Sequence, residues 1–130
     1  MKKTLLLFVG AMLMVFAVSC AKPTTYEVYN GTSGYDLYEV VGNEYLGSAL
    51  VNTTSLGYHI AANSSSGAVE AQSGANKVQV AMTFVPGGDV YTTVDYYSIN
   101  RGGHTTIVLE DETQVSGPSR AIFAIGELMK

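Results

Sequence analysis

The feature that most constrains the fold is an alternation of apolar and polar residues that recurs along the chain. It is clearest in residues 77–84, where every second position is apolar: Val78, Val80, Met82 and Phe84. Successive side chains of a strand point to opposite faces, so this pattern predicts a strand with one buried face. Residues 56–60 repeat the pattern, with Leu56, Tyr58 and Ile60 expected on one face. After residue 20, no window shows a helical repeat with caps.

Further segments rich in Tyr, Val and Thr predict more short strands, which bring the expected number to about nine. These segments are residues 25–30, 35–41, 45–50, 68–72, 90–99, 105–110 and 120–125. Turn sequences at 42–44, 86–89 and 100–103 are expected to join neighbouring strands as hairpins. Nothing between the strands is long enough for a crossover helix, so parallel pairing is not expected. The prediction is an all-β protein, an antiparallel β-sandwich of about 7–9 short strands.

The N-terminus carries a separate signal. Lys2 and Lys3 precede an apolar run at residues 5–18, which Ser19 and Cys20 follow. The run is shorter than the ~20 residues that a membrane-spanning helix requires. This arrangement is typical of an apolar, helical signal peptide.

Residues 17–20, with the sequence Ala-Val-Ser-Cys, resemble the lipobox of bacterial lipoproteins. The resemblance implies cleavage before Cys20, a thioether-linked lipid on its sulfur and an acyl chain such as palmitate on the new N-terminus. Several acyl chains together hold a protein firmly at a membrane. It also implies three parts: a signal peptide at 1–19, a lipidated tether at 20–25 and a β-sandwich domain at 26–130. The alternative is an ordinary secretory leader that lies beside a cysteine by chance.

The residues after the lipobox imply a location. Ala21 stands where lipoproteins retained at the inner membrane carry aspartate, which implies the outer membrane of a bacterial cell envelope. Residues 21–25 lack the acidic run that marks export to the cell surface in some Gram-negative groups. The resemblance therefore implies a domain that faces the periplasm.

Composition limits the partners that the chain can bind. The sequence has 7 Lys and Arg against 11 Asp and Glu, and removal of the leader would take away two of the lysines. An acidic chain with scattered cations argues against nucleic acid as a partner, and it leaves membrane attachment to the lipid on Cys20. Acylation of the single cysteine leaves no thiol for a disulfide, and about 110 residues can form a core without one.

No catalytic, cofactor-binding or metal-binding pattern follows the leader. His59 and His104 lie outside any spaced set of ligands, so the sequence gives no support for zinc. The acidic residues 110–112 lack the spaced oxygens of a calcium loop and are expected to form a solvated strand end. Asp89 and Asp95 have no further support as a glycosidase pair. We therefore expect a protein that is not an enzyme and that uses no cofactor and no metal.

Tyrosine is the compositional exception, with 9 residues against no tryptophan. One interpretation is an aromatic platform for sugar rings or for a partner protein, with Tyr29, Tyr91 and Tyr97 as its binding residues. The other is that tyrosine favours strands and bridges core and water in half-buried sheets, which we prefer for most of the nine.

Residues 25–115 are also similar to small bacterial immunoglobulin-like sandwich modules, through Leu46-Gly47, the loop at 52–55 and the alternating strand after it. The similarity concerns architecture and implies no functional residue. The expected function is a non-catalytic, membrane-anchored envelope lipoprotein that acts as a structural or protein-interaction module with a protein partner in the envelope. A glycan-binding surface module is the alternative.

Overall fold

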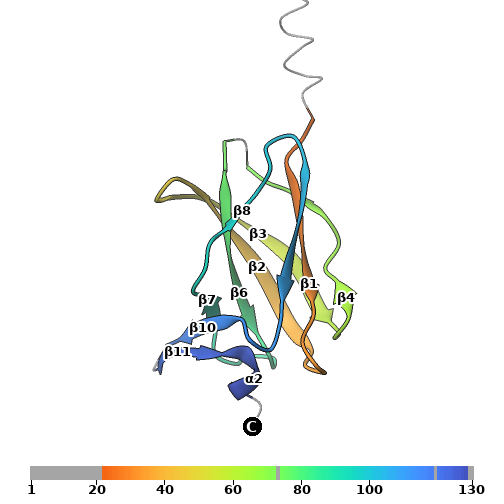
Figure 1. The fold of residues 1–130 in the computed structure, drawn as a ribbon, viewed down its shortest axis with the longest axis vertical. Coiled ribbons are helices and arrows are strands. Elements are labelled where there is room, and N and C mark those ends of the chain that lie inside the picture. Colours follow the sequence, from red (N-terminus) through yellow and green to blue (C-terminus); the bar gives the residue numbers. More distant parts are fainter. Residues whose placement is uncertain (1–21, 73, 119, 129–130) are drawn as a thin grey trace, which may run out of the picture.

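The computed structural model describes residues 22–72, 74–118 and 120–128, which form a β-sandwich (Figure 1). The all-β prediction is confirmed: within these residues the strands make one sheet of four and one of seven, with the short helix α2 (Ile125–Leu128) near the C-terminus. The predicted signal peptide and Cys20 lie outside the described residues. In the part that is described, no helix has the length and apolar character to cross a membrane.

The four-stranded sheet is built around β1 (Thr25–Asn30). One edge of β1 pairs antiparallel with β4 (Ser64–Ser65) and β5 (Val69–Glu70). The other edge pairs in parallel with β9 (His104–Leu109) along its whole length. This parallel pair departs from the expectation of hairpins alone. The two strands are far apart in the sequence and are connected through the other sheet, so their pairing needs no crossover helix.

The seven-stranded sheet has the order β11-β10-β7-β6-β2-β3, and β8 also pairs with β6. Its longest strands form a hairpin, with Gly47 in the left-handed region (φ 61°) where the chain reverses. The strands are β2 (Leu37–Leu46), β3 (Ala49–Ile60), β6 (Lys77–Thr83), β7 (Tyr91–Thr93), β8 (Tyr97–Ser98), β10 (Gln114–Gly117) and β11 (Arg120–Ala124).

The predicted turn at residues 42–44 is wrong. β2 continues through these residues, which pair with β3 on one side and with β6 on the other. Gly42 serves packing instead, because a Cβ atom there would lie 2.2 Å from the hydroxyl oxygen of Tyr26. The absence of a side chain lets the Tyr26 ring lie directly on the β2 backbone.

The other two turn predictions are confirmed. At 86–89 the Gly88 N–H donates to the Val85 carbonyl at 3.1 Å, and at 100–103 the Gly103 N–H donates to the Asn100 carbonyl at 2.9 Å. Both reversals are closed by this hydrogen bond and have a glycine with positive φ at the third position, where other residues would be strained.

The buried face predicted for β6 is confirmed at Val78, Val80 and Met82, which are almost completely buried. The alternation is not strict, because Ala81 of the opposite face is buried as well and Phe84 lies beyond the strand and is only partly buried. The prediction for residues 56–60 is wrong at one position: Tyr58 is 58% exposed, although Leu56 and Ile60 are buried. Gly57 (φ 123°) and His59 (φ 54°) leave the extended conformation, so the strict two-residue alternation does not hold across Tyr58.

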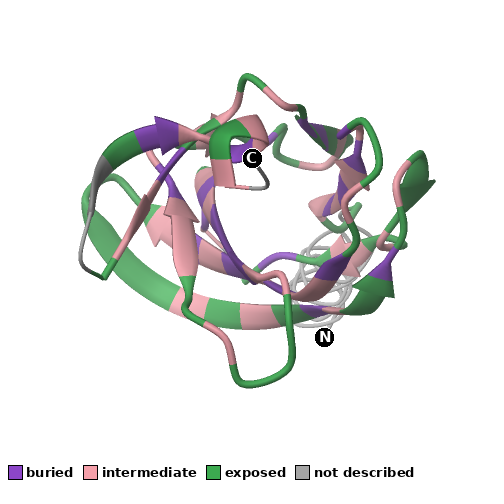
Figure 2. Cartoon of the chain, turned by 90° about the horizontal axis from the view of Figure 1, so that it is seen from below, coloured by how far each residue is buried: buried purple, intermediate pink, exposed green. Residues whose placement is uncertain are grey.

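One core lies between the two sheets, and the strands enclose it when the molecule is viewed along its length (Figure 2). Both sheets contribute alternate residues to it. The largest fully buried apolar side chains are Tyr26, Val28, Leu37, Val40, Val78, Val80, Met82, Ile107, Leu109, Val115 and Ile125.

A buried carboxylate joins the sheets. Glu44 of β2 is fully buried and accepts hydrogen bonds from the Tyr26 hydroxyl of β1 (2.7 Å), the Gln72 N–H (2.6 Å), and the side chains of Thr54 and Asn52. Burial acts to raise the pKa of Glu44, but these four donors outweigh it and hold the pKa below its usual value. Burial and the adjacent carboxylate raise the pKa of Tyr26. The pair is therefore an ionised glutamate and a neutral tyrosine.

Candidate functional site

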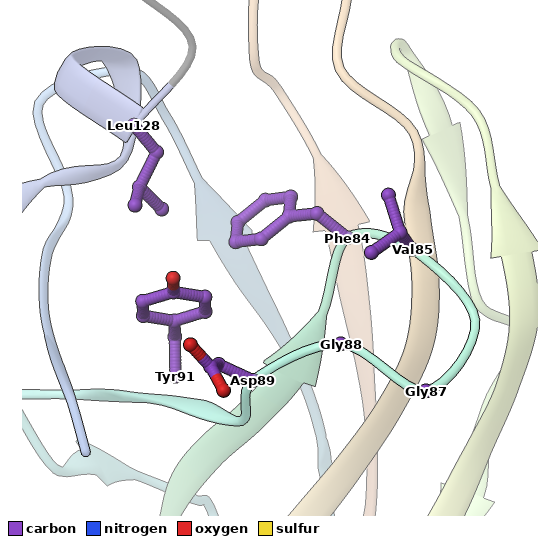
Figure 3. A pocket seen from close by; sticks show the side chains of 7 residues that line it. All are labelled: Phe84, Val85, Gly87, Gly88, Asp89, Tyr91 and Leu128. Atoms are coloured by element: carbon purple, nitrogen blue, oxygen red, sulfur yellow. The ribbon is translucent and has the colours of Figure 1, made fainter.

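A pocket of about 380 Å³ opens beside the turn between β6 and β7. Figure 3 shows the Asp89 carboxylate, the Tyr91 ring and the Phe84 ring around one space, with Leu128 of α2 on the far side. Its remaining lining residues are Val85, Gly87 and Gly88. We call one end of the sandwich the pocket pole. It carries three elements: the β6–β7 turn, the turn after β9, and the helix α2.

Packing fixes the aromatic wall of the pocket. The Tyr91 ring centre lies 5.7 Å from that of Phe84 and 5.7 Å from that of Phe123, the latter in an edge-to-face arrangement. Gly117 on β10 makes room for the ring, because a Cβ there would lie 2.7 Å from a Tyr91 ring carbon. Tyr91 is therefore held in place before any ligand arrives, which lowers the entropy cost of binding.

The β6–β7 turn positions Asp89. Gly87 takes a positive φ of 67°, and the chain then turns back through Gly88 so that Asp89 reaches the pocket mouth. A carboxylate beside aromatic faces can accept hydrogen bonds from hydroxyl or amino groups while the rings cover an apolar surface. A single carboxylate does not provide the acid–base pair of a glycosidase. The arrangement suits binding.

The three tyrosines proposed as a platform lie apart. Tyr91 lines the pocket, whereas Tyr97 on β8 is half-buried against the core at the opposite end of β6, where it pairs with Val78. Tyr29 belongs to the other sheet, between Ser65 and Val108. The pocket thus contains one of the three, and its neighbours Phe84 and Leu128 had no distinguishing signal in the sequence.

A second polar cluster lies on the surface of the four-stranded sheet. The Glu27 carboxylate contacts the His104 Nε2 atom at 2.8 Å and accepts hydrogen bonds from the Thr106 and Ser65 hydroxyls. The other ring nitrogen of His104 lies 2.9 Å from the Thr25 hydroxyl oxygen. Hydrogen bonding to Ser65 and then to His104 lowers the pKa of Glu27. The parallel pairing of β1 with β9 creates this cluster, so no local sequence pattern could have predicted it.

The Thr25 hydroxyl, the His104 imidazole and the Glu27 carboxylate follow one another in the order of a hydrolytic triad. The surroundings of the cluster differ from those of such a triad. Thr25 lies in a regular strand rather than on the strained turn that exposes a nucleophile. The pocket at Asp89 and a smaller one at Val90 lie on other strands. Within the described residues, no three His, Cys, Asp or Glu side chains are grouped so as to hold a metal ion. We interpret the cluster as a cross-strand network that stabilises the β1–β9 pair.

Comparison with known proteins gives one structural similarity. No protein-family model and no curated protein matches the chain. The NMR structure of a protein from Eubacterium rectale is similar in fold, with 20% sequence identity, a TM-score of 0.47, and coverage of 76% of this chain and 91% of that one.

Proposed function

We propose that this chain is a non-catalytic lipoprotein of the bacterial envelope, in which an immunoglobulin-like sandwich is held close to a membrane by lipid on Cys20. The observation that carries the proposal is the short distance in sequence between Cys20 and the folded domain. Thr24 already accepts hydrogen bonds from the Ala71 N–H (2.8 Å) through its carbonyl and from the Gly102 N–H (2.9 Å) through its hydroxyl. A lipid on Cys20 would therefore hold the domain directly at the membrane.

The lipid is tested by replacing its acceptor. Wild type and Cys20→Ser are grown with an alkyne-bearing palmitate analogue and fractionated into membrane and soluble parts. We expect label and membrane location in the wild type, and neither in the variant. Equal label in both proteins, or a soluble wild type, would contradict the proposal.

The outer membrane, with the domain facing the periplasm, is the proposed location. The support is the Ala21 residue and the absence of acidic residues just after it in the sequence. Density-gradient separation of the two membranes tests the first part. Protease added to intact and to permeabilised cells tests the second, and we expect degradation only after permeabilisation.

The proposed activity is binding of a protein partner at the pocket pole. This end, which carries α2, lies opposite the start of β1 (Figure 1), so it is the end that a protein on the periplasmic side would meet. Wild type, Tyr91→Ala and the control Tyr29→Ala are purified from detergent-solubilised envelopes and compared by mass spectrometry. A partner captured by wild type and control but lost with Tyr91→Ala would support the proposal. A partner set that is the same for all three would contradict it.

Glycan binding in the same pocket is the second candidate, and the joint presence of Tyr91 and Asp89 favours it. A sugar ring places C–H groups on an aromatic face and hydroxyls toward a carboxylate. Calorimetric titration with envelope and dietary glycans tests it, with Asp89→Asn expected to weaken binding and Asp95→Asn as control. Absence of heat for all glycans would remove this candidate.

A further inference from the structure

We propose that one end of the sandwich, which we call the N-terminal pole, lies against the surface of the bilayer, so that the anchored domain has a fixed orientation. The N-terminal pole consists of residues 22–25, 46–50, 74–77 and 99–103. The inference rests on the lipid attachment proposed above and adds to it a second contact, made by the protein itself. The partner of this surface is a membrane with anionic headgroups.

A chain of hydrogen bonds makes the N-terminal pole one unit. Thr25 N–H donates to the Gly103 carbonyl (3.0 Å), and the loop that holds Gly103 leads back to Ile99, whose N–H donates to the Asn76 carbonyl (3.1 Å). Asn76 in turn donates its N–H to the Tyr45 carbonyl (2.9 Å) at the end of β2. The β2–β3 turn is thereby fixed relative to the start of β1, and Figure 1 shows both at the same end of the molecule.

Apolar side chains at this end are left in water. Leu46 is 49% exposed and Leu50 is 56% exposed, on the two sides of the β2–β3 turn. Leu50 pairs with Tyr45, and Tyr45 also pairs with Lys77, so these three side chains share one face of the sheet. Tyr96 packs edge-to-face on Tyr45 with 5.1 Å between ring centres. Leucine beside tyrosine and lysine is the composition of a surface that sits at a membrane interface.

Charge is divided between the two poles. Three of the Lys and Arg residues between positions 22 and 128 belong to the N-terminal pole, namely Lys22, Lys77 and Arg101, and the fourth, Arg120, begins β11 away from it. Lys77 Nζ also lies 5.0 Å from the centre of the Tyr96 ring. Two acidic residues lie beside this end: Glu70 of β5 pairs with Thr25, and Glu27 lies two residues further along β1. The pocket pole carries acidic residues in the loops and helix that form it: Asp36, Asp89, Glu110, Asp111, Glu112 and Glu127.

This division of charge favours one orientation on an anionic surface. The chain as a whole is acidic, so electrostatics alone would not bring it to the membrane. Once lipid holds it there, the cationic end is attracted to the headgroups and the acidic end is repelled. Cys20 precedes Thr24 by four residues, which span about 14 Å when fully extended. A tether of at most that length lets the N-terminal pole reach the headgroups and enter their potential, which decays over roughly 8 Å at physiological ionic strength.

The natural absence of tryptophan provides the test. Leu50→Trp on the N-terminal pole and Val85→Trp on the pocket pole place one fluorophore at each end, at positions of matched exposure (56% and 58%). The full-length lipidated proteins are reconstituted into vesicles of phosphatidylethanolamine and phosphatidylglycerol with brominated acyl chains. We expect quenching of the tryptophan at position 50 several-fold stronger than at position 85. We also expect high salt and the added substitution Lys77→Glu to reduce the difference.

Two outcomes separate this inference from the function on which it rests. Labelled, membrane-bound protein with equal quenching at both positions, or stronger quenching at position 85, would overturn the orientation and leave the lipoprotein intact. Absence of palmitate label would overturn both. Leu46→Trp repeats the measurement on the other side of the turn, and circular dichroism confirms that each variant is folded. Agreement between positions 46 and 50 supports the proposed contact, and quenching at neither contradicts it.

Discussion

Glu44 and Glu27 are two carboxylates with similar partners and different surroundings. Each accepts hydrogen bonds from several groups, and each has a pKa held below its usual value by those bonds. Glu44 is fully buried between the sheets, whereas the Glu27 side chain keeps 23% of its surface exposed on the outside of one sheet. Water can replace a lost partner at Glu27 but not at Glu44. The comparison teaches that burial, rather than the number of donors, determines what such a cluster contributes to stability.

The largest effect is expected for Glu44→Gln. The substitution keeps the size of the side chain but turns an amide N–H₂ toward groups that are themselves donors. We expect the free energy of unfolding to fall by roughly 2–4 kcal/mol, measured by urea denaturation. Glu39→Gln on the same strand is the control, with a change within about 0.5 kcal/mol. Equal effects of the two substitutions would refute the role assigned to burial.

Tyr26→Phe should have the next largest effect. It removes the hydroxyl that joins the two sheets but leaves Glu44 with three donors, so we expect a loss of about 1–2 kcal/mol. Tyr29→Phe on the same strand serves as the control, and its unfolding midpoint should stay at the wild-type value. A destabilised control would show that loss of any tyrosine hydroxyl on β1 has this effect.

The pH dependence of stability should depend on the Glu44 carboxylate, whose pKa is lowered in the fold. A carboxyl with a folded pKa below its unfolded value adds stability above the unfolded pKa and loses it as the pH falls through the folded pKa. Wild type should therefore lose stability below about pH 5 more steeply than Glu44→Gln does. Unfolding curves measured from neutral to acidic pH provide the check. Parallel pH profiles for the two proteins would mean that Glu44 is not ionised in the fold.

The smallest effect is expected for Glu27→Gln. The exposed contact between Glu27 and the His104 ring, with its hydrogen bonds, contributes less than about 1 kcal/mol, and salt screens the electrostatic part of that contribution. We expect the difference from wild type to shrink further in high salt, while the effect of Glu44→Gln persists. A loss at Glu27 as large as that at Glu44 would contradict the comparison.

The local sequence pattern predicted those strands correctly in which apolar and polar residues alternate. It gave a wrong prediction where a residue distant in sequence determines the local structure. The alternation at Val78, Val80 and Met82 predicted a buried face correctly, because strand periodicity is a local property. Gly42 was interpreted as a turn residue, although Tyr26 in the other sheet requires a glycine there. Nothing within a few residues of Gly42 could have distinguished these two uses of glycine.

The candidate sites also depend on contacts between residues that are distant in sequence, which a local pattern does not show. Tyr91 was among the residues predicted to bind, but its pocket also needs Phe84 from the preceding strand and Leu128 from the C-terminal helix. The partners of Glu27 come from β4 and β9, and those of Glu44 from β1, β3 and the segment after β5. Sequence alone indicates which residues can take part in chemistry, whereas the fold determines which of them meet.

The parallel pairing of β1 with β9 has a consequence for the order in which the molecule is completed. Thr25 and His104 lie 79 residues apart, so a ribosome makes the first strand long before its neighbour. Until then one side of β1 has no partner from its own chain, and a contact this remote in sequence is slow to form. The four-stranded sheet therefore stays incomplete during most of synthesis. It is completed only when β9 has been made and pairs with β1.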